Sequence, residues 1–227
     1  MRVLAIDTAL EACSAAVLDT DQGGVLASES IAMARGHAEA LMPLIARVMS
    51  EALLEFLDLD RIAVTVGPDS FTGLRVGVSA ARGIAVAAGK PAVGLTTLAA
   101  FAAPYIAADD VTPLLAAIDA RNDQVYMQLF GPAGRTLIAP RLATVREAVR
   151  SATGASARVV GSGAALVAAA WPPSEKQPAV VDAARAPLID WVAHLGAAAS
   201  HALSLPKPLY LRAPDAQPQD AAHLARR

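Results

Sequence analysis

The chain has 227 residues, of which 55% are hydrophobic, 18% charged and 4% aromatic, and its formal net charge is −2. This composition excludes an intrinsically disordered protein, and the length suits one large domain or two of about 100–120 residues. The near-neutral charge gives no basic surface for binding nucleic acid alone, and a single cysteine, Cys13, excludes a disulfide framework and a cysteine-rich metal site.

No targeting or membrane segment is expected. The apolar run at the N-terminus meets Asp7 after only four residues, which is shorter than the apolar region of a secretory signal. Arg82 and Lys90 interrupt the Ala-rich runs well short of the ~18 apolar residues that a membrane helix requires. We therefore expect a cytoplasmic protein with no membrane contact and, because Cys13 lies in an apolar alternating segment, a buried and inert thiol.

The first half of the chain predicts three strands followed by alternating helices and strands. The strands cover residues 2–8, 12–19 and 25–33, with a hairpin turn at residues 19–24. A helix over residues 36–50 is predicted because Leu41, Leu44, Ile45 and Val48 repeat at i, i+3, i+4, i+7. A strand at 62–66, a helix at 74–88, a strand at 92–95 and a helix from Thr97 complete this half.

The most informative segment of the chain follows the strand Ile62–Val66. We call residues 67–77 the signature; they read Gly-Pro-Asp-Ser-Phe-Thr-Gly-Leu-Arg-Val-Gly. Between a strand and a helix, Ser70 or Thr72 is expected to cap the helix, and unpaired N–H groups at a helix N-terminus favour an anion. Arg75 would add positive charge one turn further on. The alternative is a plain capped junction with close packing, and the segment is not a P-loop.

The second half of the chain repeats the plan of the first. Residues 114–120 mirror residues 3–9, and aligning Asp7 with Asp119 places strand 124–130 at the position of strand 12–18. A turn at 131–134, a helix at 145–150, a strand at 158–161 and a helix from Ala164 follow, and residues 172–178 form a surface loop. Such repetition indicates duplication of one α/β unit.

Two lobes are therefore expected, over residues 1–104 and 105–227. A long helix over residues 187–203 is predicted in the second, and it is expected to pack back on the first lobe. The polar tail from Asp215 is expected to fray.

Each of these halves places an acid at the end of its first strand. Asp7, with Thr8 and Glu11 nearby, stands where a phosphate-binding hairpin would place a carboxylate associated with Mg²⁺. This doubled layout is that of the actin-like ATPase superfamily. The alternative is that Asp7 and Asp119 bind turn amides, which is favoured for Asp119 and evenly balanced for Asp7.

Four segments together resemble the TsaB (YeaZ) family of bacterial tRNA threonylcarbamoyladenosine biosynthesis proteins. They are residues 1–9 with 11–14, the signature, residues 115–121 with 125–126, and the segment Pro208-Leu209-Tyr210-Leu211-Arg212, and they cover both halves in the expected order. The resemblance implies two tandem actin-like, ribonuclease H-like lobes with mixed sheets flanked by helices. The chain departs from the family at Asp69, where glycine is usual, and a carboxylate there would repel phosphate. The segment between Met49 and Asp60 is also shorter than usual.

The resemblance further implies a non-catalytic subunit that scaffolds and activates a TsaD-like transferase. That paralogue binds a metal through two histidines four residues apart, and the matching positions here are Thr97 and Phe101, which do not replace imidazole. We expect no catalytic residue, no metal and no cofactor held by the chain alone, with ATP or ADP at the interface with the partner. A TsaE-like ATPase and, through the complex, tRNA are further expected partners.

Two groups of residues are candidate sites. The first is a nucleotide-binding or interface loop of Asp7, Thr8, Glu11, Ser70, Thr72, Gly73 and Arg75. The second is a partner-binding helix, which would also permit a homodimer when the partner is absent, with Ala38, Leu41, Met42 and Ile45.

Two other function classes are weighed against this one, and the sequence favours neither, because Asp69 intrudes in the loop that a kinase would need and the chain is short for that class. An autonomous actin-like ATPase or small-molecule kinase would need an intact phosphate loop and a general base. A metallopeptidase would need a pair of histidine ligands or a His-Glu-x-x-His motif, which the sequence lacks.

Overall fold

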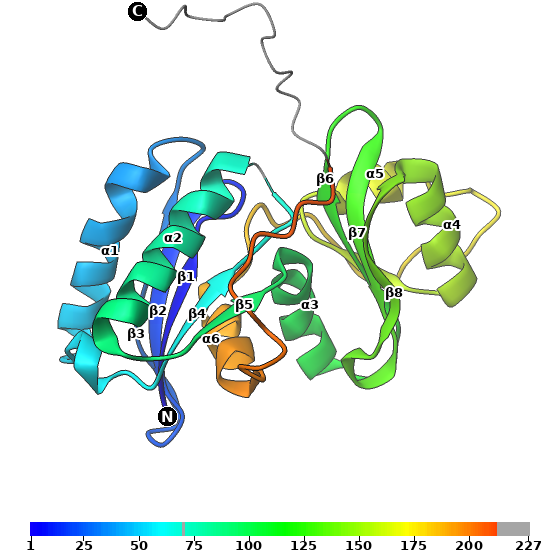
Figure 1. Ribbon diagram of the computed structural model, residues 1–227. Helices are drawn as coiled ribbons and strands as arrows, with labels where there is room; N and C mark the ends of the chain where they lie inside the picture. Colours follow the sequence, from blue (N-terminus) through cyan, green and yellow to red (C-terminus); the bar gives the residue numbers. More distant parts are fainter. Residues whose placement is uncertain (70, 213–227) are drawn as a thin grey trace, which may run out of the picture.

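The computed structural model describes residues 1–69 and 71–212, with only the backbone of Phe71. Two lobes lie side by side, each built on a five-stranded mixed sheet (Figure 1). The expected fold of two tandem α/β lobes, each a mixed sheet flanked by helices, is confirmed. The tail expected to fray from Asp215 lies outside the described residues.

The two sheets share one strand order. The first runs β3-β2-β1-β4-β5 and the second β8-β7-β6-β9-β10, with the first three strands of each antiparallel and the last ones parallel. The duplication predicted from the sequence is therefore present in the topology. The strands are β1 (Arg2–Asp7), β2 (Ala12–Asp19), β3 (Gly24–Ala32), β4 (Arg61–Thr65), β5 (Ala92–Leu95), β6 (Leu114–Asp119), β7 (Gln124–Phe130), β8 (Thr136–Thr144), β9 (Arg158–Val160) and β10 (Val181–Asp182).

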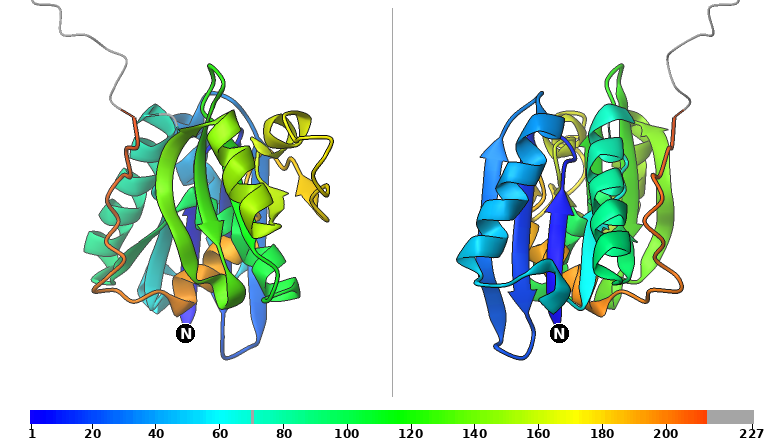
Figure 2. Two further views of the ribbon diagram at one scale, coloured as in Figure 1. Left: turned by 90° about the vertical axis from the view of Figure 1, so that its right-hand side faces the viewer. Right: turned by 60° about the vertical axis from the view of Figure 1, so that its left-hand side comes forward.

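Helices cover both faces of each sheet. In the first lobe α1 and α2 lie on one face and α6 on the other, while in the second lobe α4 and α5 lie opposite α3 (Figures 1 and 2). The helices are α1 (His37–Glu51), α2 (Phe71–Ala88), α3 (Thr97–Ala108), α4 (Val145–Ala155), α5 (Ala164–Ala169) and α6 (Ile189–Ala198), and two short 3₁₀ turns are η1 (Phe56–Asp58) and η2 (Pro132–Gly134).

Alternation along β1 divides the first core into two layers. Leu4 and Ile6 point toward α1 and α2, whereas Val3 and Ala5 point toward α6, and all four are fully buried. A strand buried on both faces has no polar alternation, which is why the sequence of β1 is a continuous apolar run. Cys13 is buried in the layer under α1 and α2, as expected.

The helix α6 comes from the second half of the chain but packs on the first sheet. Gly196 lies directly against Ala63 of β4. The approach is so close that a Cβ on Gly196 would collide with the Cβ of Ala63. Arg61 Nη1 donates hydrogen bonds to the carbonyls of Gly196, Ala197 and Ala199 at 2.7–3.1 Å. These carbonyls have no partner within the helix, so Arg61 caps its C-terminus.

Three helix bounds differ from the prediction. α6 covers residues 189–198 rather than 187–203, because the chain turns over residues 200–204 after the Arg61 cap. α4 continues past Arg150 to Ala155, and α2 begins at Phe71, three residues before Leu74. The lobe boundary expected between residues 104 and 105 falls inside α3.

Within the described residues, no helix combines the length and the apolar character needed to cross a membrane.

Candidate functional site

The turn between β1 and β2 lies against the signature at one end of the first sheet. Asp7 Oδ1 accepts hydrogen bonds from the Ala9 N–H, at 3.0 Å, and from the Thr65 hydroxyl. Register places Ile6 beside Val64 in the parallel pair β1–β4, so Asp7 and Thr65 end neighbouring strands. Sequence reasoning missed the Asp7–Thr65 pair, since only this register brings the two residues together.

Two further contacts join the turn to the signature. Thr8 Oγ1 donates to the Gly73 carbonyl at 2.8 Å, and Asp69 Oδ2 accepts the Leu10 N–H at 2.9 Å. Gly77 allows this approach, because a Cβ there would collide with Thr8 Oγ1. The candidate residues Asp7, Thr8 and Gly73 are thus brought together as expected.

The remaining loop candidates stand apart from this cluster. Thr72 is exposed and lies inside the first turn of α2, so it does not cap the helix; the earlier start of α2 is the reason. Arg75 is exposed, and its Nε donates to the Tyr210 hydroxyl at 3.2 Å. Glu11 forms an exposed ion pair with Arg185 at 2.8 Å. Ser70 lies outside the described residues.

Burial dominates the electrostatics of Asp7. Loss of solvent raises the pKa of Asp7 to about 7, although the hydrogen bonds from Thr65 and Ala9 lower it, and the charge of Asp69 raises it further. Within the described part of the chain, Asp7 Oδ2 is buried without a hydrogen-bond partner. Only Oδ1 of the Asp7 carboxyl group therefore accepts hydrogen bonds from described residues.

The arrangement leaves little for an anion to bind. The amides of Ala9 and Leu10, which a phosphate would use in a phosphate-binding hairpin, donate to Asp7 and Asp69 instead. The charge of Asp69 at this end of the sheet also repels a phosphate. The side chains of Asp7 and Asp69 thus occupy the backbone amides that an anion would need at this turn.

Asp119 repeats half of this arrangement in the second lobe. Its Oδ1 accepts the Arg121 N–H at 2.7 Å, two residues on, as Asp7 does for Ala9. Its own N–H donates to Ser162 Oγ at 3.3 Å, and the side chain is exposed. Asp119 therefore binds turn amides, which was the favoured interpretation of the sequence.

Thr97 and Phe101 lie one turn apart near the start of α3. Thr97 is fully buried, and Phe101, 3% exposed, packs with Leu98 and with Leu114 and Ile118 of the second sheet. Among the described residues, no group of three or more His, Cys, Asp or Glu side chains is placed to hold a metal ion. This part of α3 is packed as core.

The candidate partner helix α1 presents only part of its predicted residues to solvent. Ala38 and Met42 are exposed, Met42 by 48%. Leu41 and Ile45, 1% and 0% exposed, belong to the core under α1, so the expectation that they lie at a partner surface needs correction. Their spacing marks the buried stripe of an amphipathic helix.

Small and apolar side chains make up much of the solvent face of α1 and α2. Ala38, Met42, Pro43 and Ala46 are exposed on α1, and Ser79, Gly83, Val86 and Ala87 on α2. Gly83 lies in the middle of α2, and a Cβ at this position would meet no atom within 4 Å. A glycine in an exposed helix interior lowers stability by about 0.5–1 kcal/mol relative to alanine, so Gly83 does not serve the stability of the isolated chain. Sequence reasoning missed Gly83, although a glycine in mid-helix is the signal.

A surface hollow lies in the second lobe, away from both candidate sites. It has a volume of about 490 Å³ and is lined by Arg146 and Arg150 of α4, by Glu175 in the loop after α5 and by Asp123 in the turn between β6 and β7. Charges of both signs border it, and none of the residues of the loop or helix sites contributes to it.

Sequence comparison finds one matching family and several related proteins. Residues 12–181 match the family described as TsaD: tRNA N6-adenosine threonylcarbamoyltransferase. The chain is 36% identical over 126 residues to the tRNA threonylcarbamoyladenosine biosynthesis protein TsaB of Escherichia coli, a match that covers 56% of this chain and 53% of that protein. It is 34% identical over 219 residues to the uncharacterized protein Rv3421c of Mycobacterium tuberculosis, covering 95% and 94% of the two chains.

Comparison with solved structures agrees. The solved structure of YeaZ from Pseudomonas aeruginosa has a TM-score of 0.78 with this chain at 28% identity, covering 92% of this chain and 99% of that one. The likeness extends over both lobes, whereas the matched part of the E. coli protein is about half of its length.

Proposed function

The chain belongs to the TsaD protein family, in its TsaB (YeaZ) branch, and we propose from this that it acts in tRNA threonylcarbamoyladenosine biosynthesis as a partner of a TsaD-like transferase. In this role it carries no catalytic residue of its own. It supports the active form of the transferase by docking against it, in the cytoplasm.

The observation that carries this proposal is the packing of Thr97 and Phe101. By the family resemblance, these positions correspond to the two metal-binding histidines of the transferase. Here one is a buried hydroxyl and the other a phenyl ring in the apolar cluster between α3 and the second sheet. Neither replaces an imidazole ligand, and a metal ion would have no room where Phe101 packs.

The signature supports the same assignment against an autonomous ATPase or kinase. Its Asp69 and the nearby Asp7 occupy the amides of Leu10 and Ala9, so the chain offers no free phosphate cradle at this turn. We propose that the chain alone holds no nucleotide and that any ATP or ADP binds at the interface with the partner.

The exposed faces of α1 and α2 are the proposed docking surface. Ala38 and Met42 on α1 and Gly83 and Val86 on α2 would let helices of a TsaD-like partner approach closely. The same surface would serve a homodimer in the absence of that partner.

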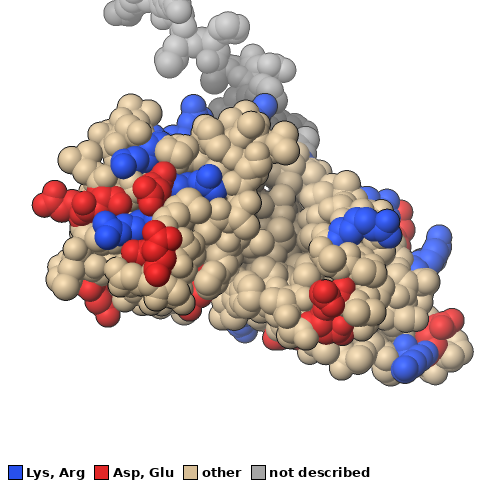
Figure 3. All heavy atoms as spheres, turned by 90° about the horizontal axis from the view of Figure 1, so that it is seen from below, with Lys and Arg blue, Asp and Glu red and all other residues tan. Residues whose placement is uncertain are grey.

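The tRNA would be reached through this complex, which would also include a TsaE-like ATPase. The lower face of the molecule mixes Lys and Arg with Asp and Glu, with no broad basic area (Figure 3). The net charge of the whole chain is −2, so we propose that a partner supplies the positive surface that a tRNA backbone requires.

Reconstitution tests the proposal. Purified chain, a TsaD-like transferase with its TsaE-like ATPase, and the complete set are each supplied with threonylcarbamoyl-adenylate and unmodified tRNA. Transfer is expected from the complete set and not from this chain alone. Threonylcarbamoyl transfer with this chain as the sole polypeptide would refute a partner role. Full transfer by the transferase and ATPase without this chain would refute activation.

A further inference from the structure

The segment after α6 connects three parts of the molecule that are distant in sequence. We call residues 204–212 the strap; it contains the Pro208–Arg212 motif that the sequence singled out. In two views it runs beside α2 from the edge strand β5 toward the second lobe (Figures 1 and 2).

Backbone hydrogen bonds hold the strap to the first lobe. The Gly94 N–H of β5 donates to the Ser204 carbonyl at 2.7 Å, and the Leu209 N–H donates to the Val66 carbonyl at 2.7 Å. The Leu209 side chain packs against the core under α1 and α2. The strap is therefore built into the first lobe at two points.

The approach of the strap to β5 is close enough to require a glycine. A Cβ on Gly94 would lie 2.7 Å from the Leu205 carbonyl oxygen and 3.1 Å from Pro206 Cα. Since a real Cβ does not approach backbone atoms so closely, any larger residue at position 94 would displace the strap.

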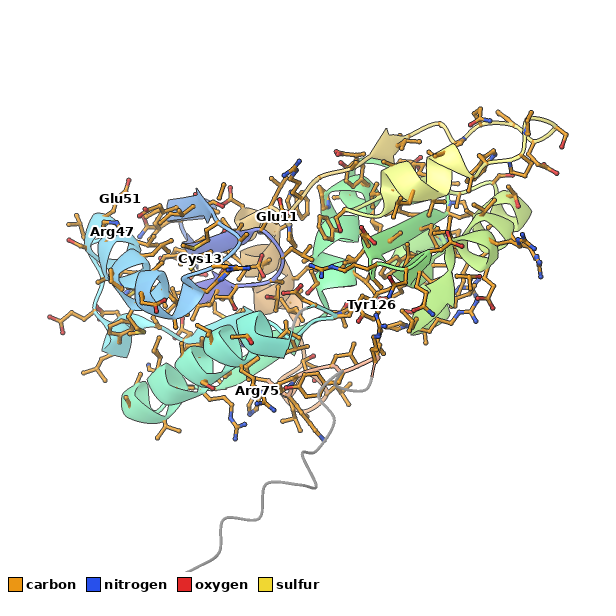
Figure 4. All side chains as sticks on the ribbon, turned by 90° about the horizontal axis from the view of Figure 1, so that it is seen from above. Glu11, Cys13, Arg47, Glu51, Arg75 and Tyr126 are labelled. Atoms are coloured by element: carbon orange, nitrogen blue, oxygen red, sulfur yellow. The ribbon has the colours of Figure 1, made fainter. Side chains whose placement is uncertain are left out.

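The far end of the strap reaches the signature helix and the second lobe. The Tyr210 hydroxyl accepts a hydrogen bond from Arg75 Nε at 3.2 Å, and Figure 4 shows Arg75 on the side of α2 beside the strap. Arg212 Nη1 donates to the Ala120 carbonyl at 3.2 Å, at the turn that follows β6. One short segment thus contacts β5, α2 and the second lobe.

Two lobes of one chain are expected to move relative to one another unless the interface between them is large and hydrophobic. The ion pair Glu11–Arg185 that crosses between them is 54% and 82% exposed, and an exposed pair of this kind contributes little. We propose that the strap is a clamp that holds the two lobes in one orientation and fixes the signature helix against them. The clamp is a property of the chain alone and does not depend on the transferase partner.

Two measurements on the full-length chain test the clamp. Hydrogen exchange reports the Gly94 and Leu209 amides directly, and both are expected to exchange slowly, as closed hydrogen bonds do. Spin labels at Ser50→Cys on α1 and Ala165→Cys on α5 report the separation of the lobes, in samples diluted with unlabelled chain. Cys13 does not interfere, because it is buried.

Arg212→Ala releases the end at the second lobe, and Leu209→Pro removes the N–H donated to Val66. Either change is expected to broaden the distance distribution, and Leu209→Pro to speed exchange at Gly94 by about tenfold or more. Lys207→Ala is the matched control, because the hydrogen bond from Lys207 to the Leu205 carbonyl uses the backbone N–H, which the substitution keeps. It should leave both measurements unchanged.

Two outcomes would overturn the clamp. One is fast exchange of the Gly94 and Leu209 amides in the unaltered chain, which needs no variant. The other is an unchanged, narrow distance distribution in Arg212→Ala, a surface substitution that keeps every backbone bond of the strap. If Leu209→Pro fails to fold, these two results still decide whether the strap acts as a clamp.

Discussion

Asp69 Oδ2 accepts the backbone N–H of Leu10 at 2.9 Å, a contact between residues 59 positions apart. It joins the signature to the turn after β1 and uses an amide that a phosphate would otherwise bind. The residue that departs from the family pattern thus has a structural role. The negative charge that disfavours nucleotide at this loop also helps to close it.

Replacing Asp69 should cost stability. Asp69→Ala leaves the Leu10 N–H without its acceptor, and a hydrogen bond to a charged group contributes about 1.5–3 kcal/mol. Asp69→Asn keeps an acceptor oxygen and should lose less. Urea unfolding of both variants measures the difference, and equal stability of Asp69→Ala and the unaltered chain would show that the contact contributes nothing.

Asp7 should make stability depend on pH. Its folded pKa, about 7, lies above the ordinary value of 3.8, so between these values the folded state binds more protons than the unfolded state. The stability contributed by this group therefore falls as pH rises from about 4 to 7, by at most about 1.4 kcal/mol per pH unit.

Asp7→Asn removes this titration while preserving the size of the side chain and an oxygen acceptor for Thr65 and Ala9. Denaturant unfolding at pH 5 and pH 8 should show a smaller loss for the variant than for the unaltered chain. Parallel pH profiles for the two proteins would contradict a buried, titrating Asp7.

Ala38→Glu tests the proposed docking surface. A carboxylate at Ala38 would be buried without a partner when a helix docks, at a cost of about 3–5 kcal/mol, and should weaken association with a TsaD-like transferase strongly. The lone chain should melt as before, because an acid in the first turn of a helix is favourable. Ala165→Glu, an exposed alanine of α5, is the control. Gel filtration of the mixtures gives the answer, and undiminished association of Ala38→Glu would remove α1 from the interface.

Gly83→Ala should separate stability from association. The added methyl meets no atom within 4 Å and should stabilise the isolated chain by about 0.5–1 kcal/mol. If a partner helix passes over Gly83, the same methyl weakens binding. Calorimetric melting and binding titration on one preparation test both effects. Tighter or unchanged binding would mean that no backbone approaches α2 at this point.

Gly196→Ala should be strongly destabilising. Its Cβ would collide with that of Ala63, so α6 must shift away from β4, and such overpacking costs about 1–3 kcal/mol. Gly154→Ala in α4 is the matched control, since no atom lies within 4 Å of its Cβ position and a small gain is expected. Equal melting temperatures for the two variants would refute the close packing of α6 on β4 at Gly196 and Ala63.

Local pattern was enough to predict most elements of the fold. The bounds of β2, β5 and β7 were predicted to the residue, because alternation and flanking Gly, Asp or Pro residues mark strand ends. The end of α6 was missed because Arg61, 135 residues earlier, caps it. Hydrophobic spacing found Leu41 and Ile45 but did not tell a core face from a partner face.

The candidate loop was only partly predictable for a related reason. Asp7 and Thr8 were identified from their place at the end of a strand. Their partners Thr65 and Gly73 were not, because strand register and the packing of the signature bring them close. Contacts of this kind depend on tertiary structure that no short window of sequence contains.

The return of α6 to β4 has a consequence for how the chain is made. Residues 1–104 emerge from the ribosome long before the helix Ile189–Ala198. Until that helix emerges, it cannot cover the apolar layer of Val3, Ala5 and Ala63. The first lobe cannot finish folding during its own synthesis, unlike a domain that folds as soon as it leaves the ribosome. A gene cut at the boundary between the halves would therefore encode a first half that exposes this layer and tends to aggregate.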